Sequence, residues 1–178
     1  IIHASSSTTV YTGDLRRHGS KPDLTMDFLE KSAKEKPDVV ITENTNMTGV
    51  EVSSEREVTE KLNSIITHTS GLVLVDFACA DVDRLRSFHR VAERNGRNLA
   101  VTMKQAYLLH KLSGDPHLNI PKIDDENLLV FQRTKKKYFS WEQDVMKLGK
   151  AVDSAEIAGK QNRLILAVSF CDLGELVG

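Results

Sequence analysis

Hydrophobic positions along the chain fall into two kinds of segment, which alternate. Short continuous runs of β-branched, aliphatic and aromatic residues are typical of strands in a sheet that is covered on both faces. These runs lie at residues 8–11, 39–42, 72–75, 99–101, 128–131 and 164–170. The run at 39–42, which contains Val39, Val40 and Ile41, predicts a strand that is buried on both sides.

Between the runs, apolar residues recur every three or four positions, which predicts amphipathic helices. The predicted helices lie at residues 24–36, 54–68, 81–95, 104–112, 141–150 and 154–161. Ser54 and Glu57 have the spacing of a capping box at the start of the second helix. Strands that alternate with crossover helices predict an α/β protein with a parallel sheet and helices on both faces. Polar residues around Gly49 predict a domain boundary near residue 50.

Composition limits the function. Of the 178 residues, 40% are hydrophobic and 28% are charged, and the formal net charge is −1, so the chain is not a generally basic nucleic-acid binder. Cys79 and Cys171 lie in or beside apolar runs, which predicts buried, reduced thiols and a cytoplasmic location. No apolar run approaches the length that spans a bilayer, so no membrane partner is expected.

A turn after the first strand carries candidate metal chemistry. Gly13 allows the backbone to turn sharply, so that Asp14 projects at the carboxyl end of the strand, where open α/β sheets place their sites. Asp14 and His18 offer an oxygen and a nitrogen ligand for a divalent metal. A solvated turn, in which Asp14 bonds to nearby backbone, fits the same residues.

A resemblance gives this segment a further meaning. Tyr11-Thr12-Gly13-Asp14-Leu15-Arg16-Arg17-His18-Gly19 resembles the fourth metal-binding motif of the metallo-β-lactamase-fold nucleases of the β-CASP family. One helix and one strand later, Val39-Val40-Ile41-Thr42-Glu43-Asn44-Thr45-Asn46 resembles the acidic motif of that family. The order of the later strands and helices is similar to that of the β-CASP insertion. The resemblance covers nearly the whole chain.

The resemblance implies a zinc-dependent ribonuclease that acts in RNA processing or decay. Residues 1–50 would be part of a metallo-β-lactamase fold and residues 51–178 a β-CASP-like domain. In such enzymes two zinc ions activate the water that attacks the phosphorus. The resemblance implies that Asp14 would bridge the two ions and that Glu43 would orient a histidine ligand without binding the metal itself. His18 matches no metal ligand of the family, so its role stays open.

The resemblance also implies that most metal ligands lie outside this chain. The histidine cluster that precedes the Gly-Asp motif in the family is absent, and the six histidines are scattered. We therefore expect an inactive fragment. The complete protein would bind single-stranded RNA, and the resemblance is compatible with a homo-oligomer.

Charged residues supply candidate contacts to RNA. Arg84 follows the strand at 72–75 and can hold a phosphate with two parallel bonds; near it, Asp81 and Asp83 fit either a ligand site or a helix N-terminus. Arg133, Lys135, Lys136 and Lys137 are interleaved with aromatic residues, a pattern that grips single strands. A solvated loop explains the same run of charges.

Two other functions fit the same sequence. One is a non-catalytic subunit of the same fold that binds RNA or supports assembly, and the other is a small-ligand-binding α/β module. The chain has no GxGxxG after a strand, no P-loop and no Gly-x-Ser-x-Gly elbow, which argues against dinucleotide, P-loop and elbow-serine chemistry.

Overall fold

The computed structural model describes residues 1–15, 17–19, 21–43 and 54–176. The chain forms two compact units, Ile1–Val58 and Thr59–Gly178. The boundary predicted near residue 50 falls within residues 44–53, outside the described residues, so the division into 1–50 and 51–178 stays a prediction. No helix built from the described residues is long and apolar enough to cross a membrane.

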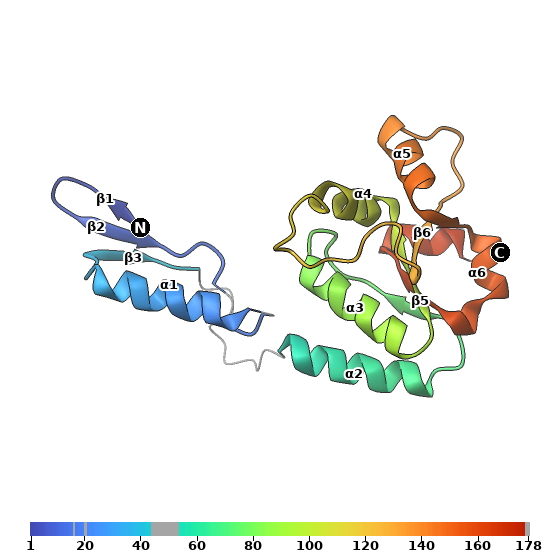
Figure 1. The fold of residues 1–178 in the computed structure, drawn as a ribbon, viewed down its shortest axis with the longest axis horizontal. Coiled ribbons are helices and arrows are strands. Elements are labelled where there is room, and N and C mark those ends of the chain that lie inside the picture. Colours follow the sequence, from blue (N-terminus) through green and yellow to red (C-terminus); the bar gives the residue numbers. More distant parts are fainter. Residues whose placement is uncertain (16, 20, 44–53, 177–178) are drawn as a thin grey trace. The chain divides into compact units, whose positions relative to one another are not determined.

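The first unit contains a three-stranded sheet and one long helix (Figure 1). Its sheet has the order β1-β2-β3, and the strands are β1 (Ile2–His3), β2 (Thr8–Tyr11) and β3 (Val39–Ile41). The connection from β2 to β3 contains α1 (Pro22–Lys34), so these two strands run parallel. Pro22 suits the first turn of α1 because proline needs no hydrogen-bond acceptor there.

The predicted burial of the third strand is wrong. Val39, Val40 and Ile41 are 47%, 58% and 50% exposed. β3 is an edge strand whose one neighbour among the described strands is β2. The continuous apolar run identified a strand correctly, but sequence cannot show whether other elements cover it.

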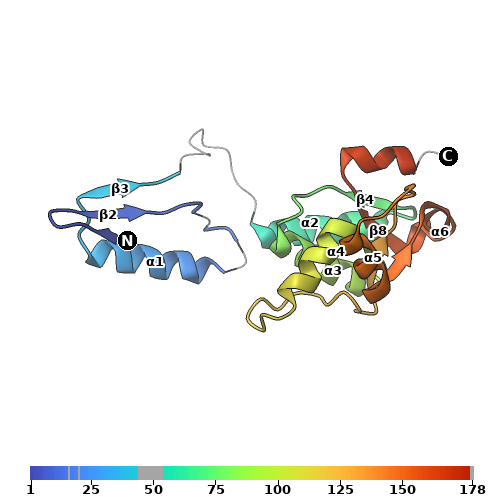
Figure 2. The same ribbon diagram turned by 90° about the horizontal axis from the view of Figure 1, so that it is seen from above.

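The second unit is built from alternating strands and helices (Figure 2). Its helices are α3 (Val82–Arg94), α4 (Met103–Leu112), α5 (Ser140–Leu148), α6 (Ser154–Gly159) and most of α2 (Glu55–His68), which begins before Thr59. Two short 3₁₀ helices are η1 (Gln161–Arg163) and η2 (Phe170–Glu175). Its strands are β4 (Val73–Val75), β5 (Asn98–Thr102), β6 (Leu128–Phe131), β7 (Lys150–Val152) and β8 (Leu164–Ala167). The sheet order is β4-β8-β5-β6-β7, and all neighbouring strands are parallel, which confirms the predicted fold class.

Each face of this sheet has its own hydrophobic core. Side chains that alternate along the strands, such as Val101 and Val130, pack with residues of α2, α3, α4 and α5. Those that point the other way, such as Ala100 and Leu166, pack with α6 and η2. Figure 1 shows α3 and α4 on one side of β5 and β6, and α6 on the other. Helices therefore flank both faces, and the sheet edge at the carboxyl ends of the strands is left for polar groups.

Several predicted elements end earlier than expected, and two of them show why. The helix predicted at 141–150 ends at Leu148, and the short strand β7 follows because it pairs with β6. The strand predicted at 164–170 ends at Ala167, and the chain turns into η2. Cys79 and Cys171 are free and exposed, not buried, because both lie beyond the strand ends.

Candidate functional site

The parallel pairing of β2 and β3 brings the two candidate metal-motif segments to one sheet edge. Tyr11 pairs with Ile41, so the residues that follow each strand emerge side by side. Glu43 Oε1 accepts a hydrogen bond from the backbone N–H of Leu15, with a distance of 3.0 Å. Glu43 is thereby held beside the residue that follows Asp14. The carboxylates of both Asp14 and Glu43 belong to exposed residues.

Glycine is needed in the turn before Asp14. Gly13 has φ +57°, a conformation that side chains with a Cβ rarely adopt, although the space around its Cα is open. Thr12 fixes the turn from both sides, because its N–H donates to Ile41 O (3.0 Å) and its hydroxyl donates to Gly13 O (2.8 Å). The predicted sharp turn is confirmed.

The described residues do not form a metal centre alone. Among residues 1–15, 17–19, 21–43 and 54–176, no three His, Cys, Asp or Glu side chains converge in a way that could hold an ion. Asp14 offers a single carboxylate, whereas a catalytic zinc site generally takes three protein ligands. Asp14 and Glu43 therefore supply at most part of such a site.

A pocket of about 370 Å³ lies in the second unit at the carboxyl edge of its sheet. Its lining comes from residues that end or follow β4, β5, β6 and β8. The lining residues are Asp76, Phe77, Cys79, Thr102, Met103, Lys104, Gln105, Phe131, Arg133, Lys135, Trp141, Glu142, Val168, Ser169, Cys171 and Asp172. Open parallel sheets bind their ligands at this edge.

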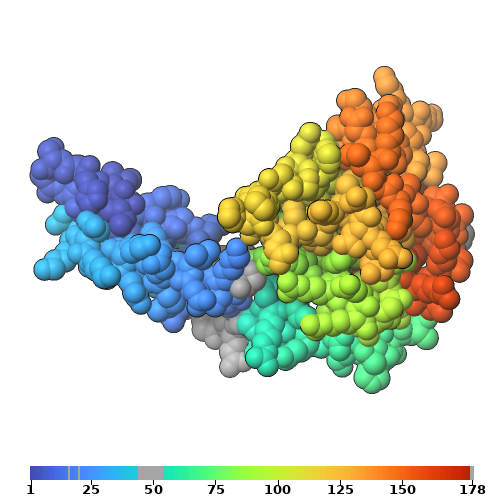
Figure 3. Space-filling model, in the orientation of Figure 1, coloured from blue at the N-terminus to red at the C-terminus, as the bar shows by residue number. Residues whose placement is uncertain are grey.

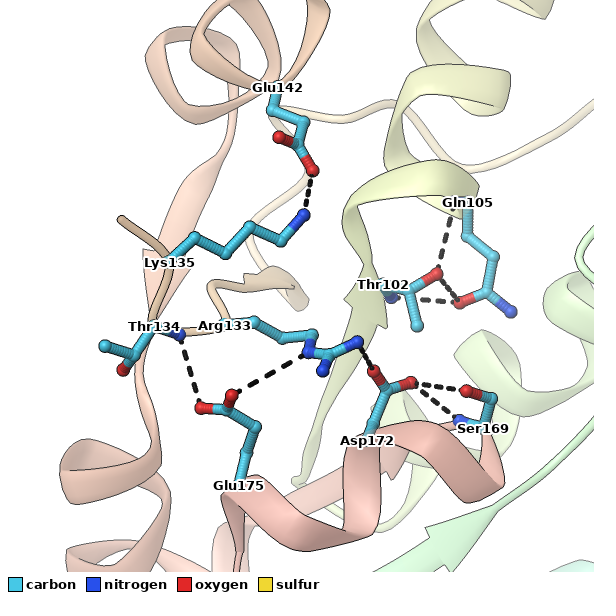
Figure 4. Close-up of polar contacts among 9 residues, drawn as sticks. All are labelled: Thr102, Gln105, Arg133, Thr134, Lys135, Glu142, Ser169, Asp172 and Glu175. Atoms are coloured by element: carbon cyan, nitrogen blue, oxygen red, sulfur yellow. Dashed lines mark hydrogen bonds and ion pairs between the residues drawn. The ribbon is translucent and has the colours of Figure 1, made fainter. Parts of the chain in front are cut away.

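Two of the predicted RNA-contact residues are tied into this pocket by ion pairs (Figure 4). Arg133 Nη1 lies 2.8 Å from Asp172 Oδ1, and Arg133 Nε lies 3.9 Å from Glu175 Oε1. Lys135 Nζ donates to Glu142 Oε1. The side chains of Asp172 and Glu142 are only 7% and 3% exposed, so each needs its cation to compensate for lost hydration.

Each of these acids also caps the helix on which it lies. Glu142 Oε2 accepts the Phe139 N–H (2.9 Å) at the start of α5. Asp172 Oδ2 accepts the Ser169 N–H (2.8 Å) and hydroxyl (2.9 Å) at the start of η2. The two carboxylates therefore connect helix starts to the loop after β6.

Two side chains of the pocket have shifted pKa values. Burial alone would raise the pKa of Glu142, but hydrogen bonds from Lys135 and the Phe139 N–H and the positive charge of Lys135 outweigh it, so the pKa lies below its ordinary value. Partial desolvation raises the pKa of the Cys79 thiol, although the residue is exposed, and the charge of Lys104 opposes this rise only in part. Glu142 is therefore ionised at neutral pH and Cys79 is a protonated thiol.

The other cations of the basic stretch behave differently. Lys136 and Lys137 are exposed, and neither has an ion pair among the described residues. Phe139 is 67% exposed, whereas the ring of Trp141 packs against that of Tyr107 with centroids 5.4 Å apart. These residues lead into α5, whose orange atoms lie at the surface of the second unit (Figure 3). Lys136 and Lys137 thus differ from Arg133 and Lys135, which form ion pairs with buried carboxylates.

Arg84 lies in the first turn of α3, and it is not among the residues that line the pocket. Its backbone N–H donates to Asp81 Oδ1 (3.0 Å), so Asp81 is the N-cap of α3. Asp83 pairs with Arg86 at 2.5 Å. The helix-terminus interpretation of the two acids is therefore the one that the contacts favour, while phosphate binding by Arg84 stays a prediction.

Sequence reasoning missed three charged or amide side chains of the pocket, namely Gln105, Glu142 and Asp172. A local signal exists for two of them, because Thr102-x-x-Gln105 and Ser169-x-x-Asp172 have capping-box spacing. Glu142 is preceded at the cap position by Phe139, which gives no such signal.

The chain is therefore an α/β protein with two sheets. The small mixed sheet has Asp14 and Glu43 beyond its strand ends, and the open parallel sheet has a charged pocket at its carboxyl edge. No protein-family model matches the chain. The chain is 26% identical over 158 residues to Ribonuclease J 2 of Streptococcus pyogenes serotype M3, a match that covers 84% of this chain and 28% of that protein. This similarity supports a ribonuclease-like relationship. The chain thus spans little more than a quarter of that relative.

A solved structure shares the fold. It is the crystal structure of a protein of unknown function from Enterococcus faecalis V583, with a TM-score of 0.68 and 17% sequence identity. The match covers 94% of this chain and 37% of the other. At this identity the likeness concerns the fold alone.

Proposed function

We propose that the chain is part of a zinc-dependent ribonuclease of the metallo-β-lactamase-fold β-CASP family. Residues 1–50 would belong to the metallo-β-lactamase fold and residues 51–178 to the β-CASP domain. The observation that carries the proposal is the juxtaposition of the two motifs, in which Glu43 bonds to the backbone next to Asp14. The similarity to Ribonuclease J 2 supports the reaction class.

In this proposal Asp14 and Glu43 have different roles. Asp14 is exposed at the sheet edge and supplies one carboxylate to a metal centre, and the other ligands come from parts of the complete protein outside this chain. Glu43 supports the same edge through its bond to Leu15 and does not itself bind the metal. When bound, zinc would activate water and stabilise charge on the phosphate. Single-stranded RNA would contact the exposed Lys136 and Lys137, with Arg84 as a further phosphate contact.

The test uses the complete protein, with zinc content and single-turnover RNA cleavage measured in parallel. Asp14→Asn keeps the shape but removes the charge, so zinc content and rate should fall together. Glu43→Gln retains an oxygen that can accept the Leu15 N–H, so the loss should be about 10–100-fold. Asp23→Asn makes the same chemical change at an exposed position of α1 and should have no effect.

Three outcomes decide between the candidate functions. If Asp14→Asn cleaves at the parental rate, Asp14 does not bridge metals. If the parent binds RNA without cleaving it, the non-catalytic RNA-binding subunit is the correct function. A parent that neither cleaves RNA nor binds it with a steep salt dependence is a small-ligand module.

A further inference from the structure

The pocket of the second unit has a lining that suits a small, partly apolar ligand. Apolar and aromatic side chains form much of its lining, and polar groups stand between them. The apolar members are Phe77, Met103, Phe131, Trp141 and Val168. Its volume of about 370 Å³ lies at the lower end of the range for small-molecule sites, roughly 300–1,000 Å³. One ring system fits such a space better than an extended ligand does.

The charges of the pocket cancel one another. Arg133 pairs with Asp172, and Lys135 pairs with Glu142. Lys104 and Asp76 also line the pocket and carry opposite charges. With three cations and three carboxylates in the lining, no net positive charge is left to hold a bare phosphate. The ligand that suits this lining is uncharged where it enters the pocket.

Gln105 presents hydrogen-bond donors that the protein does not use. The residue is 3% exposed. Its Oε1 accepts from the Thr102 N–H (2.9 Å) and hydroxyl (3.0 Å), which fixes the orientation of the amide because only the oxygen accepts. Its Nε2 has no hydrogen-bond partner among the described residues, and Figure 4 shows it on the side away from Thr102. The Nε2 donors of Gln105, which lines the pocket, are therefore available to an acceptor on a ligand.

The amide of Gln105 sets the hydrogen-bonding character of this part of the pocket. Its nitrogen donors, in a charge-balanced and partly aromatic lining, suit a neutral ring that carries carbonyl oxygens or ring nitrogens. Nucleobases have this combination of a flat face and acceptor atoms at the edge.

We propose that this pocket binds one nucleobase of an RNA strand, with a carbonyl oxygen or ring nitrogen of the base accepting from Gln105 Nε2. The strand would continue past Lys136 and Lys137, which follow Lys135 in the same loop and are exposed. Stacking of a base on an aromatic side chain tolerates different bases, because every base has a flat π-face. The identification of RNA as the source of the base rests on the proposed function, whereas base recognition itself rests on the pocket.

Trp141 is the single tryptophan of the chain and lines the pocket, so its fluorescence reports occupancy. The 178-residue chain is titrated with uncharged nucleosides and, separately, with inorganic phosphate, with excitation at the red edge of tryptophan absorption. Nucleosides should change the emission with saturation, and phosphate should not. Gln105→Glu keeps an oxygen for the Thr102 cap but replaces the donor nitrogen, so nucleoside binding should weaken about tenfold or more. Gln161→Glu is the matched exposed control and should bind as the parent does.

A second measurement needs no substitution. Cys79 and Cys171 are the two cysteines of the chain, and both are exposed and line the pocket. Saturating nucleoside should slow their alkylation, whereas inorganic phosphate should leave the rate unchanged. Protection by nucleoside alone supports the proposal even if Gln105→Glu does not fold.

Several results would overturn the proposal. They are the absence of any nucleoside response, an equal response to phosphate, or unchanged nucleoside affinity in a folded Gln105→Glu variant. Failure of the ribonuclease assignment would look different from failure of the pocket proposal. In that case nucleosides still bind, but the complete protein does not cleave RNA. If RNA is cleaved by the complete protein at the same rate and affinity in the Gln105→Glu variant, the pocket does not serve the RNA strand.

Discussion

Glu142 shows how a single buried carboxylate can connect structure and charge. It accepts the backbone N–H that begins α5 and also pairs with Lys135 from the preceding loop. An ionised carboxylate is unfavourable in a buried position unless such partners compensate for its lost hydration. The lowered pKa of Glu142 shows that here they more than compensate. The charge of Glu142 therefore stabilises the fold at neutral pH.

This arrangement predicts a pH dependence of stability. Because the pKa of Glu142 is lower in the folded chain than its ordinary value of 4.5, its contribution is complete above that pH and is lost as the pH falls through the folded-state pKa. Glu142→Gln should reduce the unfolding free energy at pH 7 by roughly 1.5–3 kcal/mol and flatten its decline below pH 4.5. Urea unfolding from pH 3 to 7 measures both effects. Glu156→Gln, at the equivalent capping position of α6 but exposed, should change little.

At the scale of elements, local sequence patterns predicted most helices and strands of the second unit. β6 lies at the predicted residues, and α3 agrees to within one residue at each end because Asp81 caps it and Asn95 ends it. The missed elements depend on contacts far along the chain. β7 has three residues and exists through its pairing with β6, which no local pattern reveals. The exposure of β3 could not be predicted either, because the burial of a strand depends on which other elements pack against it.

The basic loop at residues 133–137 shows that contacts within a site also depend on residues far along the chain. Arg133, Lys135, Lys136 and Lys137 form one run of charges in the sequence. In the structure, Arg133 and Lys135 pair with buried acids of η2 and α5, whereas the last two lysines have no ion pair among the described residues. Partners that lie tens of residues away, such as Asp172 for Arg133, cannot be read from the run itself. A uniform role for the four cations is therefore not supported by their contacts.

Separate substitutions in this loop should give separate effects. Lys135→Ala leaves the Glu142 carboxylate buried without its cation, so we expect a loss of roughly 1.5–3 kcal/mol of stability. The double variant Lys136→Ala and Lys137→Ala should keep its stability within about 0.5 kcal/mol. In the complete protein, the double variant should bind single-stranded RNA more weakly, and its salt slope should fall by about one for each lysine. Unchanged affinity and slope would make these lysines solvated loop residues only.

The turn from α5 into β7 depends on close packing. A Cβ added to Gly149 would lie 2.7 Å from Val130 Cγ2, and Val130 is fully buried. Gly149→Ala should therefore destabilise the fold by about 1–3 kcal/mol. Gly159→Ala is the matched control, because nothing lies within 4 Å of the added atom and the substitution should be neutral or slightly stabilising. Thermal unfolding of both variants tests the difference, and equal stabilities would show that β6 can move aside.

At the scale of the whole molecule, the two units differ in how they are stabilised. Val10 is the single buried hydrophobic residue among the described part of the first unit, whereas the second unit has buried cores on both faces of its sheet. The candidate metal edge lies on the unit with little core, and the pocket lies on the unit with most of it. The chain covers 28% of Ribonuclease J 2, so the activity proposed here is one of the complete protein.

Zinc binding by the 178-residue chain alone tests whether Asp14 forms only part of a metal site. Asp14 supplies at most one bridging carboxylate, and no other group of metal-ligating side chains forms among the described residues, while a catalytic zinc site generally takes three protein ligands. We therefore expect the 178-residue chain, after chelation and reloading, to hold less than one zinc ion per molecule and to leave single-stranded RNA intact. The complete protein, treated in the same way, should recover two ions and cleave. Metal analysis and a cleavage assay on both samples measure this. Two tightly held zinc ions in the 178-residue chain would show that the ligands lie within it and that the partial-site interpretation of Asp14 is wrong.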